Sequence, residues 1–341
     1  MQEKNRKTFV CADIGSNHNR DWRIALELID SVKNSGANAA KFQTYSSETL
    51  YSKYTKDFAG YTNIPKLIKD IELPREWQKD LKKYCDDNDV EFISTPFDER
   101  AVDELYNLGV KRFKISGFEA TDIRFIKYVA STNLPLIVSV GIGTNMFTIQ
   151  FNIIYPILSI NKKCDITLLH CNHAYPTPFE DINITRLYDI RKNIRGISCI
   201  GISDHTTGII VPPIAVTHGA LFIEKHLTLN RNQKGPDHSF AINPIELKEM
   251  VKNIEIAECC MGSKKEEVIL TKSEEKYSNA MRSVVAKTNI KKSEFLTIHN
   301  VTTKRPYFHG AIHASKYYDI LDKEVKNDIL EDQIILESMI K

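Results

Sequence analysis

The sequence predicts an α/β fold, a TIM (β/α)8 barrel followed by a small, mostly β domain. Eight short apolar runs alternate with helical patterns in roughly the first 260 of the 341 residues, and eight βα units in about 250 residues are typical of such a barrel. Roughly the last 60 residues contain only short apolar pieces separated by polar turns. A doubly wound sheet built from the same units is the alternative.

The predicted strands are short, largely apolar and bounded by polar residues or glycine. They cover residues 8–13, 38–43, 91–95, 111–116, 136–140, 166–171, 198–203 and 221–224. Helices are predicted between them: apolar residues recur every four positions from Ile24 to Val32 before Gly36, and Asp98 opens a helix that ends at Gly109. Three further helices are predicted to begin at Pro74, Asp122 and Pro244.

The chain divides into two predicted domains. The barrel is expected to cover residues 1–262, and a charged segment without an apolar stripe, residues 263–281, is interpreted as a linker. Residues 282–341 form the small C-terminal domain. A module of this size has too little core to be very stable alone, so we expect it to dock on a barrel.

Composition excludes several classes of protein. The formal net charge is only +2, which disfavours nucleic-acid binding by bulk charge. No run of about eighteen apolar residues occurs, and the charged N-terminus lacks the apolar core of a secretion signal. Seven cysteines, of which only Cys259 and Cys260 are close in sequence, suggest reduced thiols. We therefore expect a cytoplasmic protein with neither membrane nor nucleic acid as a partner.

Chemically reactive side chains stand where the predicted strands end, which is where catalytic residues of TIM barrels lie. They are Asp13, Lys41 with Gln43, Thr95, Lys114 with Glu119, Ser139, His173 with Tyr175, Ser203 to His205, and Glu224 to His226. Each of these residues, taken alone, could be a helix cap or a solvent-exposed polar residue. Their shared placement predicts one active site.

Two lysines interrupt apolar strands. Lys41 and Lys114, joined by the hydroxyls of Thr95 and Ser139, would form an anion site suited to a phosphate group. The ligand predicted from this set is a small phosphorylated molecule.

Two histidines lie at consecutive strand ends. His205 and His226 would be brought together in a barrel, and two imidazoles completed by water suit Mn²⁺ or a similar divalent ion better than Ca²⁺. Mg²⁺ and Co²⁺ are the alternatives. His170 and His173 form a second pair, but strand alternation sends them to opposite faces.

Nine ordered motifs resemble those of the sialic acid (nonulosonate) synthases, the family of N-acetylneuraminate, legionaminate and pseudaminate synthases. The motifs are Ala12-Asp-Ile-Gly-Ser-Asn-His18, Lys41-Phe-Gln-Thr44, Ser94-Thr-Pro-Phe-Asp98, Phe113-Lys-Ile115, Leu169-His-Cys171 with Tyr175-Pro176, Ser203-Asp-His-Thr206, Glu224-Lys-His226, Gly235-Pro-Asp-His238 and Lys304-Arg-Pro306. The resemblance implies a TIM barrel followed by an antifreeze-like (SAF) domain, the two parts already predicted.

The resemblance implies an activity: condensation of phosphoenolpyruvate with an N-acetylated hexose, N-acetylmannosamine or a diacetamido-trideoxyhexose, to a nine-carbon sugar acid and phosphate. Expected phosphoenolpyruvate contacts are Lys41, Thr95, Lys114, Ser116, Ser139 and Ser203, and expected sugar contacts are Gln43, His173, Tyr175 and Arg305. Expected acid–base residues are Asp13, Glu119, Tyr175 and Asp237, with the metal on His205 and His226. The family also implies a domain-exchanged homodimer in which Arg305 reaches the partner's site.

The chain departs from the family pattern at four places. Asp13 replaces a usual Glu, Gly117 stands where a Ser is common, His173 stands where Asn or Ser is frequent, and the Gly usual after Pro306 is missing. Residues 118–123 are more similar to pseudaminate and spore-coat-type members than to the N-acetylneuraminate branch. The acceptor hexose stays open, because one hydrogen-bonding group can change sugar discrimination by orders of magnitude.

Two other functions fit parts of the pattern. One is another metal-dependent aldolase or deoxy-sugar-phosphate synthase on the same barrel, which would use a phosphorylated aldose and leave the C-terminal domain unexplained. The other is a non-catalytic sugar-phosphate binding protein, whose chemistry was lost through Asp13 and Gly117.

Overall fold

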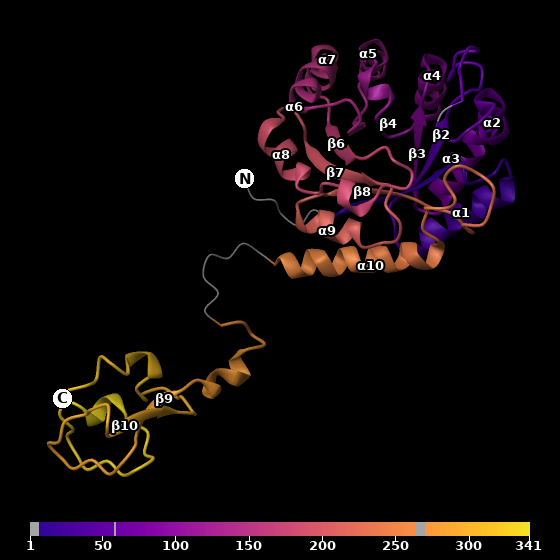
Figure 1. The fold of residues 1–341 in the computed structure, drawn as a ribbon. Coiled ribbons are helices and arrows are strands. Elements are labelled where there is room, and N and C mark those ends of the chain that lie inside the picture. Colours follow the sequence, from indigo (N-terminus) through magenta and orange to yellow (C-terminus); the bar gives the residue numbers. More distant parts are fainter. Residues whose placement is uncertain (1–6, 58, 263–269) are drawn as a thin grey trace. The chain divides into compact units, whose positions relative to one another are not determined.

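The computed structural model describes residues 7–57, 59–262 and 270–341 (Figure 1). The chain forms two compact units, Met1–Gly262 and Ser263–Lys341. Each unit is described by itself.

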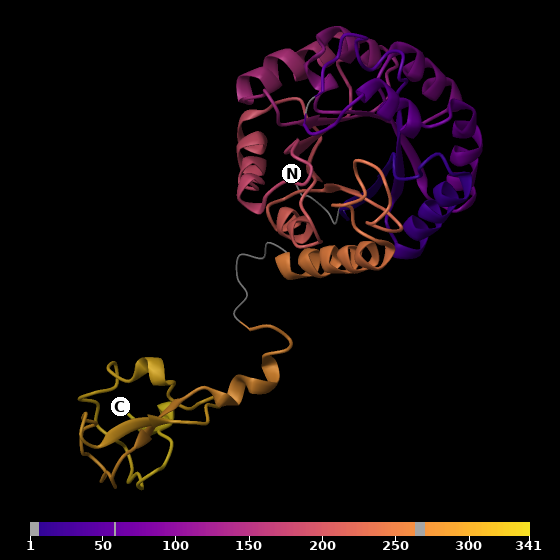
Figure 2. The same ribbon diagram turned by 45° about the vertical axis from the view of Figure 1, so that its right-hand side comes forward.

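The N-terminal unit is built on eight parallel strands, each followed by helical chain. In hydrogen-bonded order they run β3-β2-β1-β8-β7-β6-β5-β4, and β3 also contacts β4. The strands are β1 (Phe9–Gly15), β2 (Ala39–Thr44), β3 (Glu91–Pro96), β4 (Phe113–Ile115), β5 (Leu136–Val140), β6 (Ile166–Cys171), β7 (Cys199–Asp204) and β8 (Phe222–His226). Figure 2 shows them inside a ring of helices. The predicted TIM barrel is confirmed, and the doubly wound alternative was wrong.

Several helices begin or end at residues that the sequence marks, whereas the helix predicted to begin at Pro74 starts at Gln78, after the 3-10 turn Arg75–Trp77. The helices are α1 (Trp22–Ser35), α2 (Ile64–Ile71), α3 (Gln78–Asp87), α4 (Glu99–Leu108), α5 (Ile123–Ser131), α6 (Met146–Thr148), α7 (Tyr155–Ile160), α8 (Arg186–Asn193), α9 (Val211–Thr217) and α10 (Pro244–Met261). The Asp98 side chain accepts from the backbone N–H of Ala101 at the start of α4. Gly36 and Gly109 cap α1 and α4 with φ of 81° and 78°, in the left-handed region that favours glycine.

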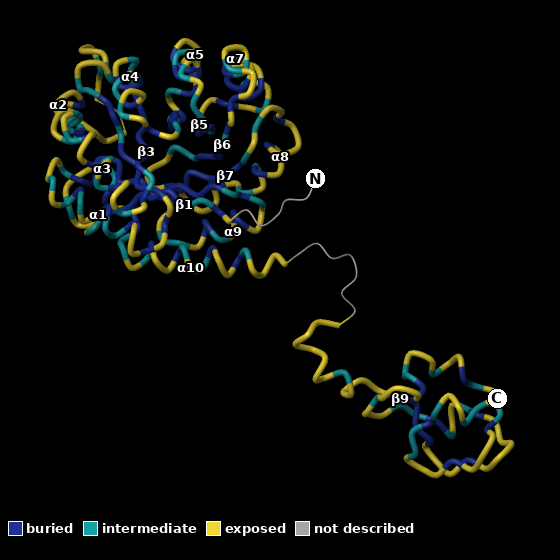
Figure 3. Tube along the Cα trace, turned by 180° about the vertical axis from the view of Figure 1, so that it is seen from behind, coloured by how far each residue is buried: buried dark blue, intermediate teal, exposed yellow. Residues whose placement is uncertain are grey.

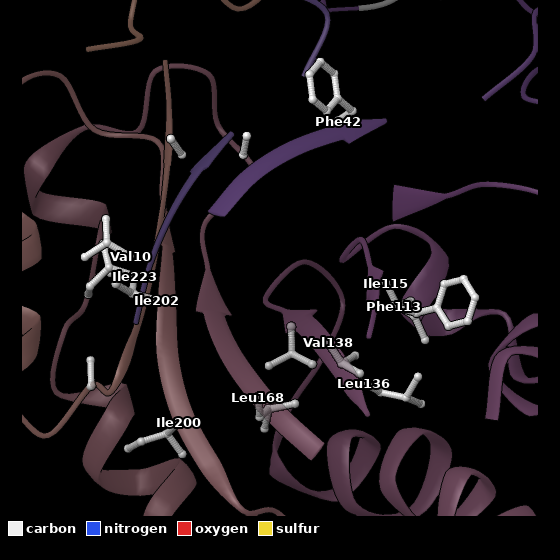
Figure 4. Packing of buried hydrophobic residues seen from close by; sticks show 14 of the residues in the cluster. Val10, Phe42, Phe113, Ile115, Leu136, Val138, Leu168, Ile200, Ile202 and Ile223 are labelled. Atoms are coloured by element: carbon white, nitrogen blue, oxygen red, sulfur yellow. The ribbon is translucent and has the colours of Figure 1, made fainter. Parts of the chain in front are cut away.

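Two apolar layers hold the barrel together. The outer layer fills the space between strands and helices, where Val10, Phe113, Val138 and Ile202 are buried (Figure 4). The strands are buried, whereas the outward faces of the helices are exposed (Figure 3). Inside the barrel, a second layer consists of Cys11, Ala39, Ile93, Ile137, Leu169 and Phe222. Because this layer closes the interior, polar side chains collect above it, at the carboxyl ends of the strands.

Several strands differ in length from the prediction. β1, β7 and β8 continue one or two residues further: Gly15 of β1 pairs with Phe42, Asp204 of β7 pairs with Lys225, and His226 of β8 pairs with Asp13. The polar side chains of Asp204, Lys225 and His226 suggest that β7 and β8 end earlier, although the backbones of these residues still pair within the sheet. β4 is shorter than predicted and contains only Phe113–Ile115.

The C-terminal unit is small and mostly irregular, with one antiparallel pair. β9 (Ser283–Ala286) pairs with β10 (Val301–Lys304), and isolated bridges join further segments. Its core consists of Val284, Ala286, Ile290, Leu296, Val301, Ile312, Ile320, Val325, Ile329 and Ile335. The prediction of a small β-type module is confirmed. No helix in the described parts of the two units is long and apolar enough to cross a membrane.

Candidate active site

A cavity opens at the carboxyl ends of the barrel strands, where the sequence places the reactive residues. Its lining is Asp13, Lys41, Gln43, Thr95, Phe97, Lys114, Ser116, Gly117, Phe118, Ser139, Cys171, His173, Tyr175, Ser203, His205, Glu224 and His226. Every strand or the loop that follows it contributes to this list. Most of the residues predicted to form the site are therefore brought together.

Three predicted site residues lie outside this lining. Glu119 accepts a hydrogen bond from the hydroxyl of Ser116, which itself lines the cavity. Asp237 lies in the loop after β8, with its Oδ2 3.9 Å from Nδ1 of His226. Arg305 is exposed on the C-terminal unit, directly after β10. The roles predicted for these residues stay predictions.

Two buried lysines meet two buried carboxylates in the cavity. Lys41 Nζ lies 2.7 Å from Asp13 Oδ2 and 3.8 Å from Glu224 Oε1, and Lys114 Nζ lies 3.3 Å from the same Glu224 oxygen. Burial opposes the charge on Lys41, but Asp13 and Glu224 outweigh it and raise the pKa of that lysine above its usual value. Lys41 therefore stays charged inside the barrel.

Glu224 was predicted among the reactive residues at the strand ends, but no role in the site was assigned to it. Its Oε1 accepts from Ser203 Oγ at 2.8 Å, between the two lysines. Burial alone would raise the pKa of Glu224, but Lys114 and Lys41 lower it to about 2. The signal was available in the sequence: strand alternation puts Glu224 on the same face of β8 as His226.

Hydroxyl groups complete this polar pocket. Lys41 Nζ donates to Thr95 Oγ1 at 3.5 Å. Ser139 Oγ is buried, and within the part of the chain that the structure describes it has no hydrogen-bond partner. A buried polar atom without a partner is costly, and an anion would supply one. Two charged lysines beside spare donors are the chemistry of an anion site.

The two histidines at the ends of β7 and β8 face one another. The ring centroids of His205 and His226 are 5.4 Å apart, and Tyr175 lies 4.3 Å from the His205 ring. His205 Nδ1 is 2.7 Å from the Asn172 carbonyl oxygen, to which it donates as a neutral imidazole. Burial, followed by His226, lowers the pKa of His205 well below its usual value. Its Nε2 therefore carries a free lone pair.

His226 has a similar arrangement. Its Nε2 is 3.3 Å from Asp13 Oδ2, while its buried Nδ1 has no hydrogen-bond partner among residues 7–57, 59–262 and 270–341. A carboxylate that contacts one ring nitrogen of a histidine orients the other ring nitrogen toward a metal ion. In those same described residues, no three His, Cys, Asp or Glu side chains are grouped to hold a metal by themselves. The pair fits an ion that takes two imidazoles and completes its shell with water or substrate.

Strand alternation sends the neighbours of these histidines out of the barrel. Lys225 Nζ lies 2.7 Å from Asp204 Oδ2 and also donates to the Thr206 carbonyl oxygen, all behind the strands. His170 likewise faces outward and lies 2.7 Å from the Ile182 carbonyl oxygen. Asp204, Lys225 and His170 are therefore not part of the cavity.

Comparisons with known proteins show which family the chain resembles. Residues 28–266 match the NeuB family and residues 281–341 match the SAF domain. The chain is 35% identical to the N,N'-diacetyllegionaminic acid synthase of Campylobacter jejuni, over 97% of this chain and 100% of the relative. It is 30% identical to the pseudaminic acid synthase of the same species, over 98% and 96%.

A solved structure has the same architecture. The N-acetylneuraminic acid (sialic acid) synthetase of Leptospira borgpetersenii, in complex with citrate, superimposes with a TM-score of 0.70 at 30% identity, covering 80% of this chain and 90% of that one. The barrel, the cavity at its strand ends and these matches lead to one conclusion: the chain is an enzyme that belongs to the NeuB family and carries a C-terminal SAF domain.

Proposed function

We propose that this enzyme condenses phosphoenolpyruvate with an N-acetylated hexose, forming a nine-carbon acid of the sialic acid type and phosphate. The observation that carries the proposal is the pair of buried lysines, Lys41 and Lys114, in one cavity with the histidine pair. The names of the relatives support it, since they are synthases of legionaminic and pseudaminic acid.

Phosphoenolpyruvate would be held by charge and by hydroxyl groups. Lys41 and Lys114 offer ammonium groups that the low dielectric of the barrel strengthens. Thr95 and Ser139 add hydroxyls from two further strands, and Ser203, whose hydroxyl donates to Glu224, lines the same cavity. Carbon 3 of phosphoenolpyruvate would then face the mouth of the barrel, where a sugar aldehyde can approach.

The histidine pair would hold the metal, for which we propose Mn²⁺. When bound, a divalent ion acts as a Lewis acid that polarises the aldehyde of the open-chain sugar. His205 and His226 are held for this role by the Asn172 carbonyl group and the Asp13 carboxylate. The chain's own contribution is to fix both rings before substrate arrives.

The reaction then needs two proton transfers. Carbon 3 of phosphoenolpyruvate attacks the aldehyde carbon, and the sugar oxygen takes up a proton. Water adds to the cationic carbon 2 and loses a proton, and the tetrahedral centre expels phosphate by C–O cleavage. Asp13, Tyr175, Glu119 and Asp237 are the proposed acid–base groups. Burial raises the pKa of Glu119, which is the direction that favours a proton donor.

Replacing either lysine should weaken phosphoenolpyruvate binding. A hydrogen bond to a charged group contributes about 1.5–3 kcal/mol, so we expect Lys41→Met and Lys114→Met each to raise the KM for phosphoenolpyruvate about tenfold or more. Steady-state kinetics measure this, with thermal unfolding as a check on the fold. The exposed Lys111→Met is the matched control. Unchanged kinetics in both cavity variants would contradict the anion site.

The C-terminal unit gives a second prediction, about assembly. We propose a homodimer with exchanged C-terminal domains, in which Arg305 donates to the N-acetyl group of a sugar in the partner's barrel. Arg305→Ala and His226→Ala chains should each be inactive. Equal mixing with subunit exchange should restore about a quarter of wild-type activity, since half the dimers would be mixed and each would have one intact site. If the subunits exchange and no activity returns, Arg305 does not act across the dimer.

The direct test is release of phosphate. The full chain is mixed with phosphoenolpyruvate, Mn²⁺ and a panel of N-acetylated hexoses, including N-acetylmannosamine and diacetamido-trideoxyhexoses. We expect phosphate release with at least one of them. Release only with a phosphorylated aldose would favour a deoxy-sugar-phosphate synthase. Binding of phosphoenolpyruvate without turnover of any acceptor would favour a non-catalytic protein. The panel also identifies the acceptor hexose. We further propose a cytoplasmic location, which localisation experiments test.

A further inference from the structure

His173 occupies space that exists because its neighbour at position 117 is a glycine. A Cβ atom at position 117 would lie 1.9 Å from Nε2 and 2.3 Å from Cε1 of His173, closer than real atoms approach. A Cβ atom at position 141 would lie 3.2 Å from His173 Nδ1 and 1.7 Å from the Cys171 carbonyl oxygen. The backbone of Gly117 does not need a left-handed φ. The missing side chain at position 117 therefore serves to make room for the imidazole.

The ring is also held from the side. Phe118 packs edge-on against His173, with ring centroids 4.8 Å apart and an interplanar angle of 64°. The imidazole lines the cavity together with Lys114 and Ser116. The Ser116 hydroxyl already donates to Glu119, so it is committed elsewhere. At this part of the wall, the His173 imidazole therefore stands beside Lys114 as a polar group that faces the cavity.

The protonation state of the ring follows from its surroundings. Burial, then the charge of Lys114, lowers the pKa of His173 to about 4, so the imidazole is neutral at physiological pH and has one N–H. Nδ1 is buried and finds no hydrogen-bond partner in the described chain. A buried N–H without a partner is rarer than a lone pair without one. The hydrogen therefore belongs on Nε2, the nitrogen that lies over Gly117.

We infer that the Nε2–H of His173 donates a hydrogen bond to an anionic oxygen of phosphoenolpyruvate beside Lys114, and that Gly117 is the glycine that admits this donor. The inference rests on the proposed function and changes one expectation: the sequence placed His173 among the sugar contacts. Positions 117 and 173 form one unit, because a side chain at 117 and the imidazole of 173 exclude each other.

The test measures phosphoenolpyruvate binding to the full Mn²⁺-loaded chain by calorimetry, without acceptor. Wild-type binding comes first, because a wild-type chain that does not bind phosphoenolpyruvate contradicts the proposed function itself. His173→Ala should then raise the Kd about tenfold or more. Gly117→Ser should do the same, since its Cβ drives the imidazole out. Circular dichroism melts check that each variant is folded.

Two double variants separate hydrogen bonding from packing. Gly117→Ser with His173→Ala puts a hydroxyl into the vacated space and should return the Kd to within a few-fold of wild type. Gly117→Ala with His173→Ala fills similar space without a donor and should stay weak. If both double variants recovered the affinity for phosphoenolpyruvate equally, packing rather than a hydrogen bond would explain the effect, and the inference would be overturned. A Kd unchanged in folded His173→Ala would overturn it directly. If His173→Ala does not fold, the Kd is measured for His173→Asn, which keeps a smaller hydrogen-bond donor.

Discussion

Chelation of the metal will abolish turnover of the full chain, and Mn²⁺ will restore it. The expected loss is complete within detection, because the aldehyde would have no other Lewis acid among the groups proposed for this cavity. His205 and His226 each keep one ring nitrogen available for an ion, since the other nitrogen lies against the Asn172 carbonyl oxygen in His205 and against the Asp13 carboxylate in His226. The measurement is phosphate release before chelation, after it, and after titration with Mn²⁺.

Variants assign this metal to the histidine pair. His205→Ala and His226→Ala should lower turnover by about a thousandfold or more, and each should bind less Mn²⁺ in equilibrium dialysis. His218→Ala is the control, since His218 is exposed and bonded to the Ile214 carbonyl oxygen. Full activity of His205→Ala in metal-free buffer would contradict the assignment.

Breaking the ion pair behind the histidines will destabilise the barrel. Lys225 and Asp204 are both buried, 2.7 Å apart, on the outer face of β7 and β8. Removing one partner leaves an uncompensated buried charge, which costs about 3–5 kcal/mol. We expect Lys225→Met and Asp204→Asn each to lose about that much of the free energy of unfolding in urea.

An exposed pair provides the matched control. Lys83 and Asp87 are 2.5 Å apart on α3 but largely in solvent, and such pairs contribute only about 0–1 kcal/mol. Asp87→Asn should therefore change stability little. A Lys225→Met loss no larger than that of Asp87→Asn would contradict the structural role of the buried pair.

The fold was predictable because its pattern repeats. Each strand is a short apolar run, and Lys41 and Lys114 stand out because a charge inside such a run needs a partner at the barrel mouth. Strand alternation then explains why Lys225 and His170 are excluded from the cavity although they adjoin residues that line it.

The orientation of side chains in loops could not be predicted from the sequence. Glu119 and Asp237 follow strands, but no period governs a loop, so their orientation needed the structure. Glu224 was predicted at a strand end but given no role, because a buried carboxylate is unfavourable until both lysines are placed beside it. Gly117 and His173 each look like an isolated departure from the family pattern, because 56 residues separate them in the sequence. Only their contact in the structure shows that they are one feature.

The central claim is tested most directly by following the atoms of phosphoenolpyruvate. Substrate labelled with ¹⁸O in the oxygen that bridges carbon 2 and phosphorus is turned over with an accepted hexose, and both products are analysed by mass spectrometry. The account predicts labelled phosphate and an unlabelled acid whose mass equals the hexose plus the pyruvate unit. An acid of any other composition, or phosphate without the label, would contradict condensation with C–O cleavage in this cavity.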